Sequence, residues 1–174
     1  MPASCCGVFG LKPTRARNPL GPDYGELTHM LVVDHALTRS VRDSAALLDA
    51  TSGPAMGNPC WAPPPARPLL EEVGADPGHL RIAFTTRAAT SVTVHPDCVD
   101  AVKDAAALCS ELGHEVEEVM PDMDGDRLAQ AFVTVFSATH AMVITDIANR
   151  IGREVTPHDL EPFTWELCQM DNPP

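Results

Sequence analysis

Aromatic residues are scarce in this sequence of 174 residues, where phenylalanine, tyrosine and tryptophan together make up 5%. The hydrophobic fraction of 44% still allows a core, which must consist mainly of alanine, valine, leucine and isoleucine. No unbroken apolar run approaches the roughly 18 residues of a membrane span, and no basic stretch followed by an apolar run marks a secretion signal. We therefore expect a cytoplasmic protein that does not enter a membrane.

Positive charge is also scarce. Lysine and arginine number 12 against 24 aspartates and glutamates, which gives a formal net charge of -12. An acidic surface repels phosphate backbones, so nucleic acid is not an expected partner. None of the six cysteines forms a Cys-x-x-Cys pair, and His-Glu-x-x-His, Gly-x-Ser-x-Gly and Gly-rich phosphate-binding patterns are absent. We expect neither a metal nor another cofactor.

Three aspartates at alternate positions, Asp122, Asp124 and Asp126, resemble the opening of a calcium-binding loop. Such a loop needs glycine at its sixth position and glutamate at its twelfth. Here Gly125 is fourth and Val133 is twelfth. We interpret the aspartates as a polar turn before a helix, where a carboxylate faces the positive end of the helix dipole.

The seven histidines do not cluster, so each is interpreted alone. His95 precedes Pro96 and is expected to mark the entry to a helix. His140 lies within a helical pattern and is expected to make a structural polar contact on a half-buried face. Four cysteines are expected to pack as small apolar residues: Cys5, Cys6, Cys98 and Cys109.

Proline divides the sequence into parts. Six of the seventeen prolines lie within residues 53–68. Such a cluster favours an extended surface connection, which we place at residues 54–79. It separates an N-terminal segment, residues 1–53, from a C-terminal segment, residues 80–174.

The N-terminal segment predicts two short strands and a helix. The apolar runs Gly7–Leu11 and Leu31–Val33 are typical of buried strands. Ser40 followed by Asp43 predicts a helix start with a capping box, and Gly53 followed by proline predicts its end. The expected apolar stripe of this helix consists of Val41, Ala45 and Leu48.

The C-terminal segment predicts a β-α-β unit followed by helices. Strands are expected at Leu80–Thr85 and His114–Val119, parallel to each other, around a helix that starts near Pro96 and ends at Gly113. The apolar face of that helix consists of Val99, Val102, Ala106 and Cys109. A longer helix is expected from Asp126 to about Gly152, and a short one after Pro157. The apolar side of the longer helix consists of Leu128, Phe132, Val135, Met142 and Ile151. These elements alone indicate an α/β protein without a catalytic constellation.

Two stretches resemble the amidase signature family. The opening PASCCGVFGLKPTRAR resembles the end of the family motif, which runs Gly-Gly-Ser-hydrophobic-Arg-hydrophobic-Pro-Ala and continues through Cys-Gly-x-x-Gly-Leu-Lys-Pro-Thr. The matching residues are Pro2, Ala3, Cys6, Gly7, Gly10, Leu11, Lys12, Pro13 and Thr14. The second stretch, HALTRSVRDSAALLDATSGP, matches at Thr38, Arg39, Ser40, Val41, Asp43, Ala45, Leu47, Leu48 and Asp49. Within the family, the resemblance is to bacterial amidases.

The resemblance implies amide C–N hydrolysis by a Ser–cis-Ser–Lys triad on an α/β/α sandwich with a large mixed sheet, acting on a small-molecule amide. Aligned on the motif, the nucleophile falls upstream of Met1, and the bridging serine and the lysine lie further upstream. Ser4 and Lys12 occupy other positions of the motif, so neither is expected to be a triad residue. We expect a central part of an amidase, incomplete at both ends, with no catalytic residue, no activity alone and low solubility.

Two alternatives stay open. The chain could be a non-catalytic subunit that binds or complements a chain supplying the N-terminal half of the enzyme. It could also be an independent α/β enzyme with an unrelated site, which would require a triad or metal set that the sequence does not display. The substrate and the oligomeric state are not indicated by the sequence.

Overall fold

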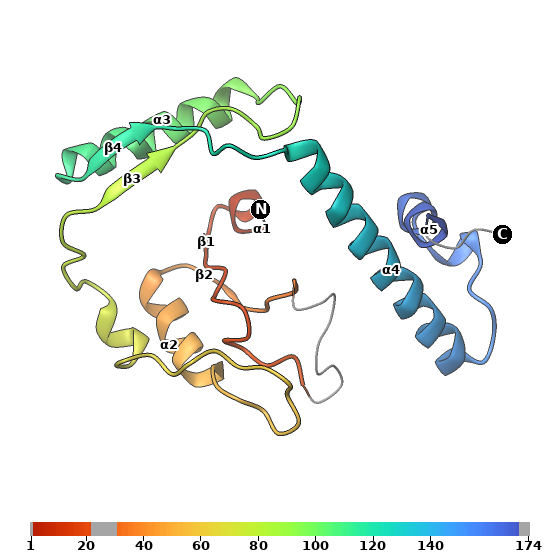
Figure 1. The fold of residues 1–174 in the computed structure, drawn as a ribbon. Helices are drawn as coiled ribbons and strands as arrows, with labels where there is room; N and C mark the ends of the chain where they lie inside the picture. Colours follow the sequence, from red (N-terminus) through yellow and green to blue (C-terminus); the bar gives the residue numbers. More distant parts are fainter. Residues whose placement is uncertain (1, 22–30, 171–174) are drawn as a thin grey trace. The chain divides into compact units, whose positions relative to one another are not determined.

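The computed structural model describes residues 2–21 and 31–170, and these form two compact units, Met1–Ala75 and Asp76–Pro174 (Figure 1). Both units contain helix and sheet, as expected for an α/β protein. Each unit holds a sheet of two strands, so the described residues contain two small sheets and not one large mixed sheet.

The first unit begins with a helix that the sequence did not predict. Helix α1 spans Pro2–Cys6, and strand β1, Phe9–Gly10, follows it and pairs antiparallel with β2, Leu37–Thr38. The strand expected at Gly7–Leu11 is therefore confirmed only at its centre. The strand expected at Leu31–Val33 is wrong, because the residues that pair with β1 lie further along the chain.

Helix α2, Val41–Thr51, starts where the sequence predicts. The Ser40 hydroxyl accepts a hydrogen bond from the Asp43 amide at 3.1 Å, which satisfies one of the free donors at the helix start. Ala45 and Leu48 are buried as expected, whereas Val41 is 53% exposed. The helix ends before Gly53, whose φ of 126° favours glycine.

The carboxylate of Asp49 in α2 holds the end of the proline-rich connection. Its proline-dense part contains no helix or strand, and a short 3-10 helix, η2, follows at Leu69–Glu72. The Asp49 carboxylate accepts hydrogen bonds from the amides of Leu69 at 2.7 Å and Leu70 at 2.8 Å. Asp49 thereby caps η2 from a distance and ties the connection to α2.

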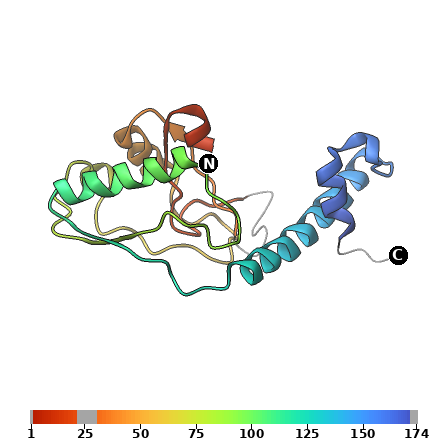
Figure 2. The ribbon, with the colours of Figure 1, turned by 90° about the horizontal axis from the view of Figure 1, so that it is seen from above.

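The second unit opens with the predicted β-α-β arrangement. Strand β3, Arg81–Phe84, pairs parallel with β4, Glu115–Glu118, and α3, Pro96–Glu111, covers one face of the pair (Figure 1 and Figure 2). The four expected apolar positions of α3 are its less exposed ones. The opposite face of the strand pair is charged, since Arg81 lies across from Glu115 and its guanidinium is 3.4 Å from that carboxylate.

Helices α4, Gly125–Ile151, and α5, Pro162–Gln169, complete the second unit and lie side by side (Figure 1 and Figure 2). Leu167 and Cys168 of α5 are buried, and burial raises the pKa of the Cys168 thiol. At the start of α4, a Cβ on Gly125 would lie 2.0 Å from the Ala89 carbonyl oxygen, so this close approach requires glycine.

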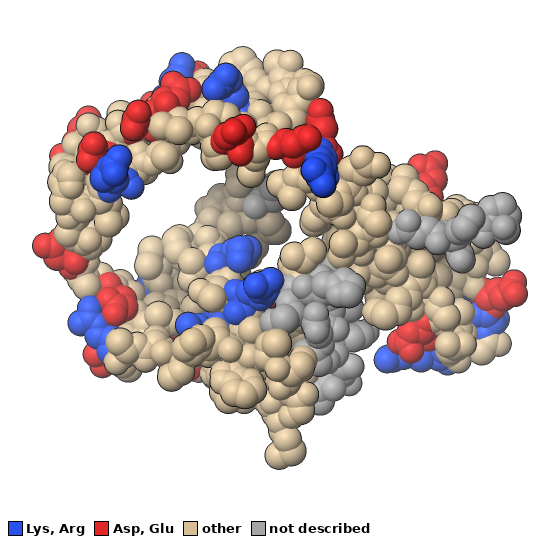
Figure 3. All heavy atoms as spheres, in the orientation of Figure 1, with Lys and Arg blue, Asp and Glu red and all other residues tan. Residues whose placement is uncertain are grey.

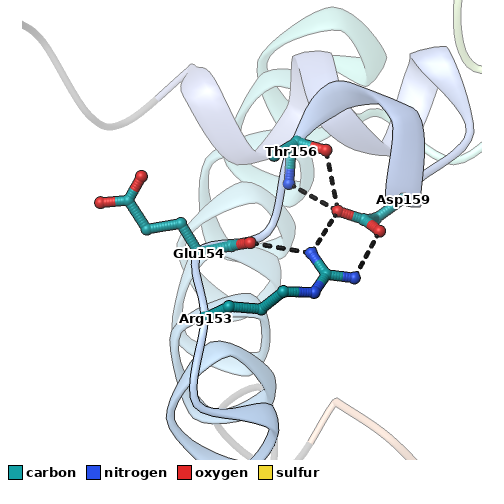
Figure 4. Close-up of polar contacts among 4 residues, drawn as sticks. All are labelled: Arg153, Glu154, Thr156 and Asp159. Carbon is teal, nitrogen blue, oxygen red and sulfur yellow. Dashed lines mark hydrogen bonds and ion pairs between the residues drawn. The ribbon is translucent and has the colours of Figure 1, made fainter.

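The turn from α4 to α5 is held by a carboxylate with several donors (Figure 4). Asp159 accepts two hydrogen bonds from the Arg153 guanidinium, at 2.8 and 2.9 Å, and two from the amide and hydroxyl of Thr156. Hydrogen bonding by Arg153, and then by Thr156, holds the pKa of Asp159 far below its ordinary value. The turn includes a 3-10 helix, η3, at Pro157–Asp159.

Helix α4 is long and apolar enough, by length and composition, to cross a membrane. It has 27 residues, and its most apolar 18-residue window has a mean hydropathy of 1.5. The expectation that nothing in the chain spans a membrane stays a prediction, because length and composition alone do not show a span. That expectation considered unbroken apolar runs, whereas α4 interrupts its apolar residues with uncharged polar ones.

Candidate functional site

The residues that match the family motif form a compact turn between α1 and β1. The Val8 amide donates to the Ala3 carbonyl at 3.0 Å, and the Gly7 amide donates to the Ser4 carbonyl at 3.4 Å. This pair of bonds is the Schellman arrangement that ends a helix, and it places Gly7 at the left-handed position with φ 63°. The first glycine of the motif therefore reverses the chain after α1.

The second motif glycine, Gly10, is required for a different reason. A Cβ on Gly10 would lie 2.6 Å from the Ala3 Cβ, closer than side-chain carbons approach each other. Gly10 lies in β1 and does not adopt a positive φ, so close packing and not backbone conformation requires glycine here. The motif thus folds α1 directly onto the strand that follows it.

Two polar motif residues, Ser4 and Lys12, could suggest catalytic chemistry, but neither has the partner that it would need. Among the described residues, no hydrogen bond joins the exposed Ser4 hydroxyl to a lysine or a histidine. The Lys12 ammonium donates to the Pro13 carbonyl at 3.0 Å. Cys5 and Cys6 are exposed on α1, so the prediction that they pack is wrong: the α1 side chain that lies against β1 is that of Ala3.

The structure brings together a histidine and a serine that sequence reasoning did not single out. His35 Nε2 lies 2.7 Å from the Ser44 Oγ, as a base and nucleophile would. Ser44 is only 1% exposed, however, and His35 Nδ1 is buried without a hydrogen-bond partner in the described residues. A nucleophile must reach its substrate and its base needs an orienting group, so the pair fits a structural link between α2 and the segment before β2. No sequence signal marks it, because only the fold sets the distance.

An apolar groove of about 200 Å³ runs along α2 beside this pair. Its lining includes Phe9 and Leu11 from the β1 region, Val41 and Leu48 from α2, and Val73 after η2. Three of these residues, Leu11, Val41 and Val73, are more than a third exposed. Two polar residues, Ser44 and Glu72, also line the groove, but each already has a partner, in His35 and Arg67 respectively. The rest of the lining is apolar, which does not orient a substrate for reaction.

The other polar candidates have structural positions. His95 Nδ1 accepts from the Asp97 amide at 3.2 Å at the start of α3, and the Asp124 carboxylate accepts from the Arg127 amide at 3.0 Å at the start of α4. His140 Nδ1 lies 2.7 Å from the Phe136 carbonyl oxygen. All three interpretations are confirmed. Cys109 is half-buried, whereas Cys98 is exposed and the prediction that it packs is wrong.

Comparison with known proteins extends the resemblance over nearly the whole chain. The family model described as Amidase matches residues 1–166. The 6-aminohexanoate-cyclic-dimer hydrolases of Pseudomonas sp. (strain NK87) and Paenarthrobacter ureafaciens are each 37% identical to the chain over 173 residues, which is 97% of the chain and 35% of each hydrolase.

A solved structure of 6-aminohexanoate cyclic dimer hydrolase complexed with substrate superposes on 97% of the chain with a TM-score of 0.85 at 34% identity. The chain covers 36% of that structure and so spans about a third of the length of the relatives it matches. The family match over most of the chain, the motif turn and the superposition lead to one conclusion: the chain belongs to the amidase family.

Proposed function

We propose that this chain is part of an amide C–N bond hydrolase and that by itself it hydrolyses nothing. The observation that carries the proposal is the motif turn, whose first helix begins at Pro2, four residues after the position that the family motif gives to the nucleophile. In the aligned motif, the attacking serine, the bridging serine and the lysine fall outside the 174 residues. The polypeptide that holds them would supply the reactive groups.

The geometry of the described residues supports inactivity. Ser4 is exposed and has no base, while Ser44 has a base and is buried. Hydrolysis by a serine requires both an accessible hydroxyl and a group that removes its proton. No described serine combines the two, so the chain alone offers no activated nucleophile.

The contribution of this chain to the whole enzyme would be positional. The turn at Gly7 and the contact between Gly10 and Ala3 fix α1 against β1, and a nucleophile preceding Pro2 would be held by this rigid turn. In the complete enzyme we place β1–β2 and β3–β4 in a larger mixed sheet with helices on both faces. Both pairs have unpaired edges to which further strands could be added.

The substrate class follows from the relatives. Both hydrolases are named for the cyclic dimer of 6-aminohexanoate, and one solved relative was determined with substrate bound. We therefore propose a small-molecule amide as the substrate of the whole enzyme. A cytoplasmic location remains part of the proposal.

The test is a direct assay of the purified chain. Incubation with 6-aminohexanoate cyclic dimer and with simple aryl amides should give no turnover above the buffer rate. The matched control is Ser44→Ala, which should leave this baseline unchanged. Turnover that survives repurification, and that Ser44→Ala or Ser4→Ala abolishes, would show an active site within the chain and refute the proposal.

A separate complementing subunit is the second candidate, and the exposed apolar surface favours it. Only four apolar residues are buried in the described part of the chain, Ala45, Leu48, Leu167 and Cys168. The DNA immediately upstream of the Met1 codon discriminates between the two candidates. An in-frame stretch encoding a lysine, Gly-Ser-rich residues and Gly-Gly-Ser would favour a single longer enzyme, and a separate reading frame for that half would favour the subunit.

A further inference from the structure

The segment that connects the two units ends in a tight turn at residues 76–78. The Asp76 carboxylate accepts a hydrogen bond from the Gly78 amide at 2.9 Å, which closes an Asx turn around Pro77. Gly78 has a φ of 67°, in the left-handed region that favours glycine. The turn therefore holds the Asp76 side chain along the peptide bond that joins Asp76 to Pro77.

This turn is open to solvent. Residues 71–80 are all exposed, no helix or strand lies between η2 and β3, and the segment is part of the surface seen in Figure 3. The nearest ionisable groups along the chain are His79 and Glu72, and Glu72 pairs with Arg67. In the part of the chain that the structure describes, no side chain of another element bonds the Asp76 carboxylate. Water and protons can therefore reach this carboxylate and the peptide bond beside it.

The bond between Asp76 and Pro77 is the only Asp-Pro bond in the sequence. A proline nitrogen belongs to a tertiary amide, which is more readily protonated than an ordinary peptide nitrogen and so leaves more easily. An aspartate side chain has the length to reach the carbonyl carbon of its own residue and close a five-membered ring. The two residue types together favour an intramolecular cleavage.

We propose that the chain cleaves itself between Asp76 and Pro77 in mild acid. A carboxyl oxygen of Asp76 attacks the Asp76 carbonyl carbon, and a five-membered cyclic anhydride forms as the C–N bond breaks. The carboxyl proton passes to the Pro77 nitrogen, which keeps the electron pair of the broken bond and leaves as an amine. One water molecule then opens the anhydride to two carboxyl groups, so the two products together contain one water more than the intact chain.

The cut falls at the boundary between the two compact units. Both strands of the β1–β2 pair precede it and both strands of the β3–β4 pair follow it, so neither pairing is interrupted. The reaction consumes one bond of the chain itself, once, and does not turn over an added amide. No residue of the amidase motif takes part, so the inference is independent of the proposed function.

The turn and the acid requirement each predict a property of the rate. The reacting form is the protonated carboxyl group, and aspartate side chains ordinarily protonate at about pH 4, so the rate should rise as the pH falls towards that value. Because the Asx turn orients the carboxyl group before reaction, the folded chain should cleave faster than the unfolded chain at the same pH.

The test follows cleavage of the purified full chain at about pH 5, with and without concentrated urea, by mass spectrometry. Gly78→Ala opposes the left-handed conformation of the turn, and its new Cβ would meet no atom within 4 Å. The matched control is Gly74→Ala, because Gly74 has a φ of 84°, equally open surroundings and a place outside the turn. Asp76→Asn removes the attacking acid. Circular dichroism shows whether each variant stays folded.

We expect two fragments, of which the second begins with Pro77, formed at a first-order rate that does not depend on protein concentration. The folded chain should cleave about 10-fold faster than the chain in urea. Gly78→Ala should lower the rate to that seen in urea, Gly74→Ala should leave it unchanged, and Asp76→Asn should abolish cleavage.

Several results would overturn the inference. An intact chain, or equal rates with and without urea, would show that the folded turn does not promote cleavage. Equal slowing by Gly74→Ala and Gly78→Ala would show that the turn around Pro77 has no particular part in it. Cleavage that persists in Asp76→Asn, or a rate that rises with protein concentration, would point to a contaminating protease.

Discussion

Replacing Gly10 with alanine tests the packing of the motif turn. The new Cβ would lie 2.6 Å from the Ala3 Cβ, well inside the usual carbon–carbon contact of about 3.5–4.0 Å. Overpacking of this kind costs about 1–3 kcal/mol, and the loss of unfolded-chain freedom on replacing glycine returns about 0.4–1 kcal/mol. We expect Gly10→Ala to lower the free energy of unfolding of the first unit by about 0.5–2 kcal/mol.

A second substitution isolates the contact. Ala3→Gly removes the opposing Cβ at a cost of about 0.5–1 kcal/mol in helix propensity. In that background the nearest atom to the new Cβ is Leu37 Cδ2 at 3.4 Å, which is ordinary contact. Gly10→Ala should then be neutral or stabilising. The double-mutant cycle should show a coupling energy of about 2 kcal/mol.

The assay must report on the first unit alone. The chain has two tryptophans, of which Trp61 lies in the first unit and Trp165 in the second. In a Trp165→Phe background, urea unfolding followed by Trp61 fluorescence gives the four free energies of the cycle. Additive effects, with Gly10→Ala equally costly in both backgrounds, would refute a direct contact between Gly10 and Ala3.

Three further predictions concern single groups. Asp49→Ala leaves the two amides at the start of η2 without their acceptor. We expect the free energy of unfolding of the first unit to fall by about 1 kcal/mol and limited proteolysis within residues 53–68 to become faster. An unchanged cleavage rate would contradict this prediction. The folded-state pKa of Asp159 is depressed, so its stabilisation of the α4–α5 turn is present above its ordinary value of 3.8 and is lost as the pH falls below it. Arg153→Ala should reduce this acid sensitivity in circular dichroism titrations. Because Cys168 is buried and its thiol pKa is raised, it should react with Ellman's reagent after the exposed cysteines, and equally fast labelling would show that α5 is not packed on α4.

Local chemistry made the elements of the second unit predictable. The β3–α3–β4 order, the proline at the start of α3 and the extent of α4 all follow from apolar spacing and from residues that start or stop helices. The parallel pairing of β3 with β4 was also expected and is confirmed. The start of α2 at Ser40 was predictable for the same reason, since the capping serine and its amide partner are three residues apart.

Features that depend on distant contacts were not predictable. The partner of β1 is β2, and nothing local to residues 31–33 or 37–38 says which run pairs with β1. The contact of His35 with Ser44 depends on how α2 packs. Helix α1 was not predicted, because a helix of five residues is too short to show a helical periodicity. The motif could be recognised in the sequence, but only the fold shows why the motif needs its glycines.

The two faces of the β3–β4 pair differ in polarity, and its edges are open to further strands. Parallel sheets are usually covered on both faces, and their strands are then apolar throughout. Here Ile82, Phe84 and Val116 are half-buried, whereas Arg81 and Glu115 on the other face form an exposed ion pair. Covering that face with an apolar helix would bury these charges at a cost that a surface ion pair does not repay. In the complete enzyme we therefore expect added strands to join at the open edges, and any helix on the charged face to offer polar or charged partners to Arg81 and Glu115 and not an apolar stripe.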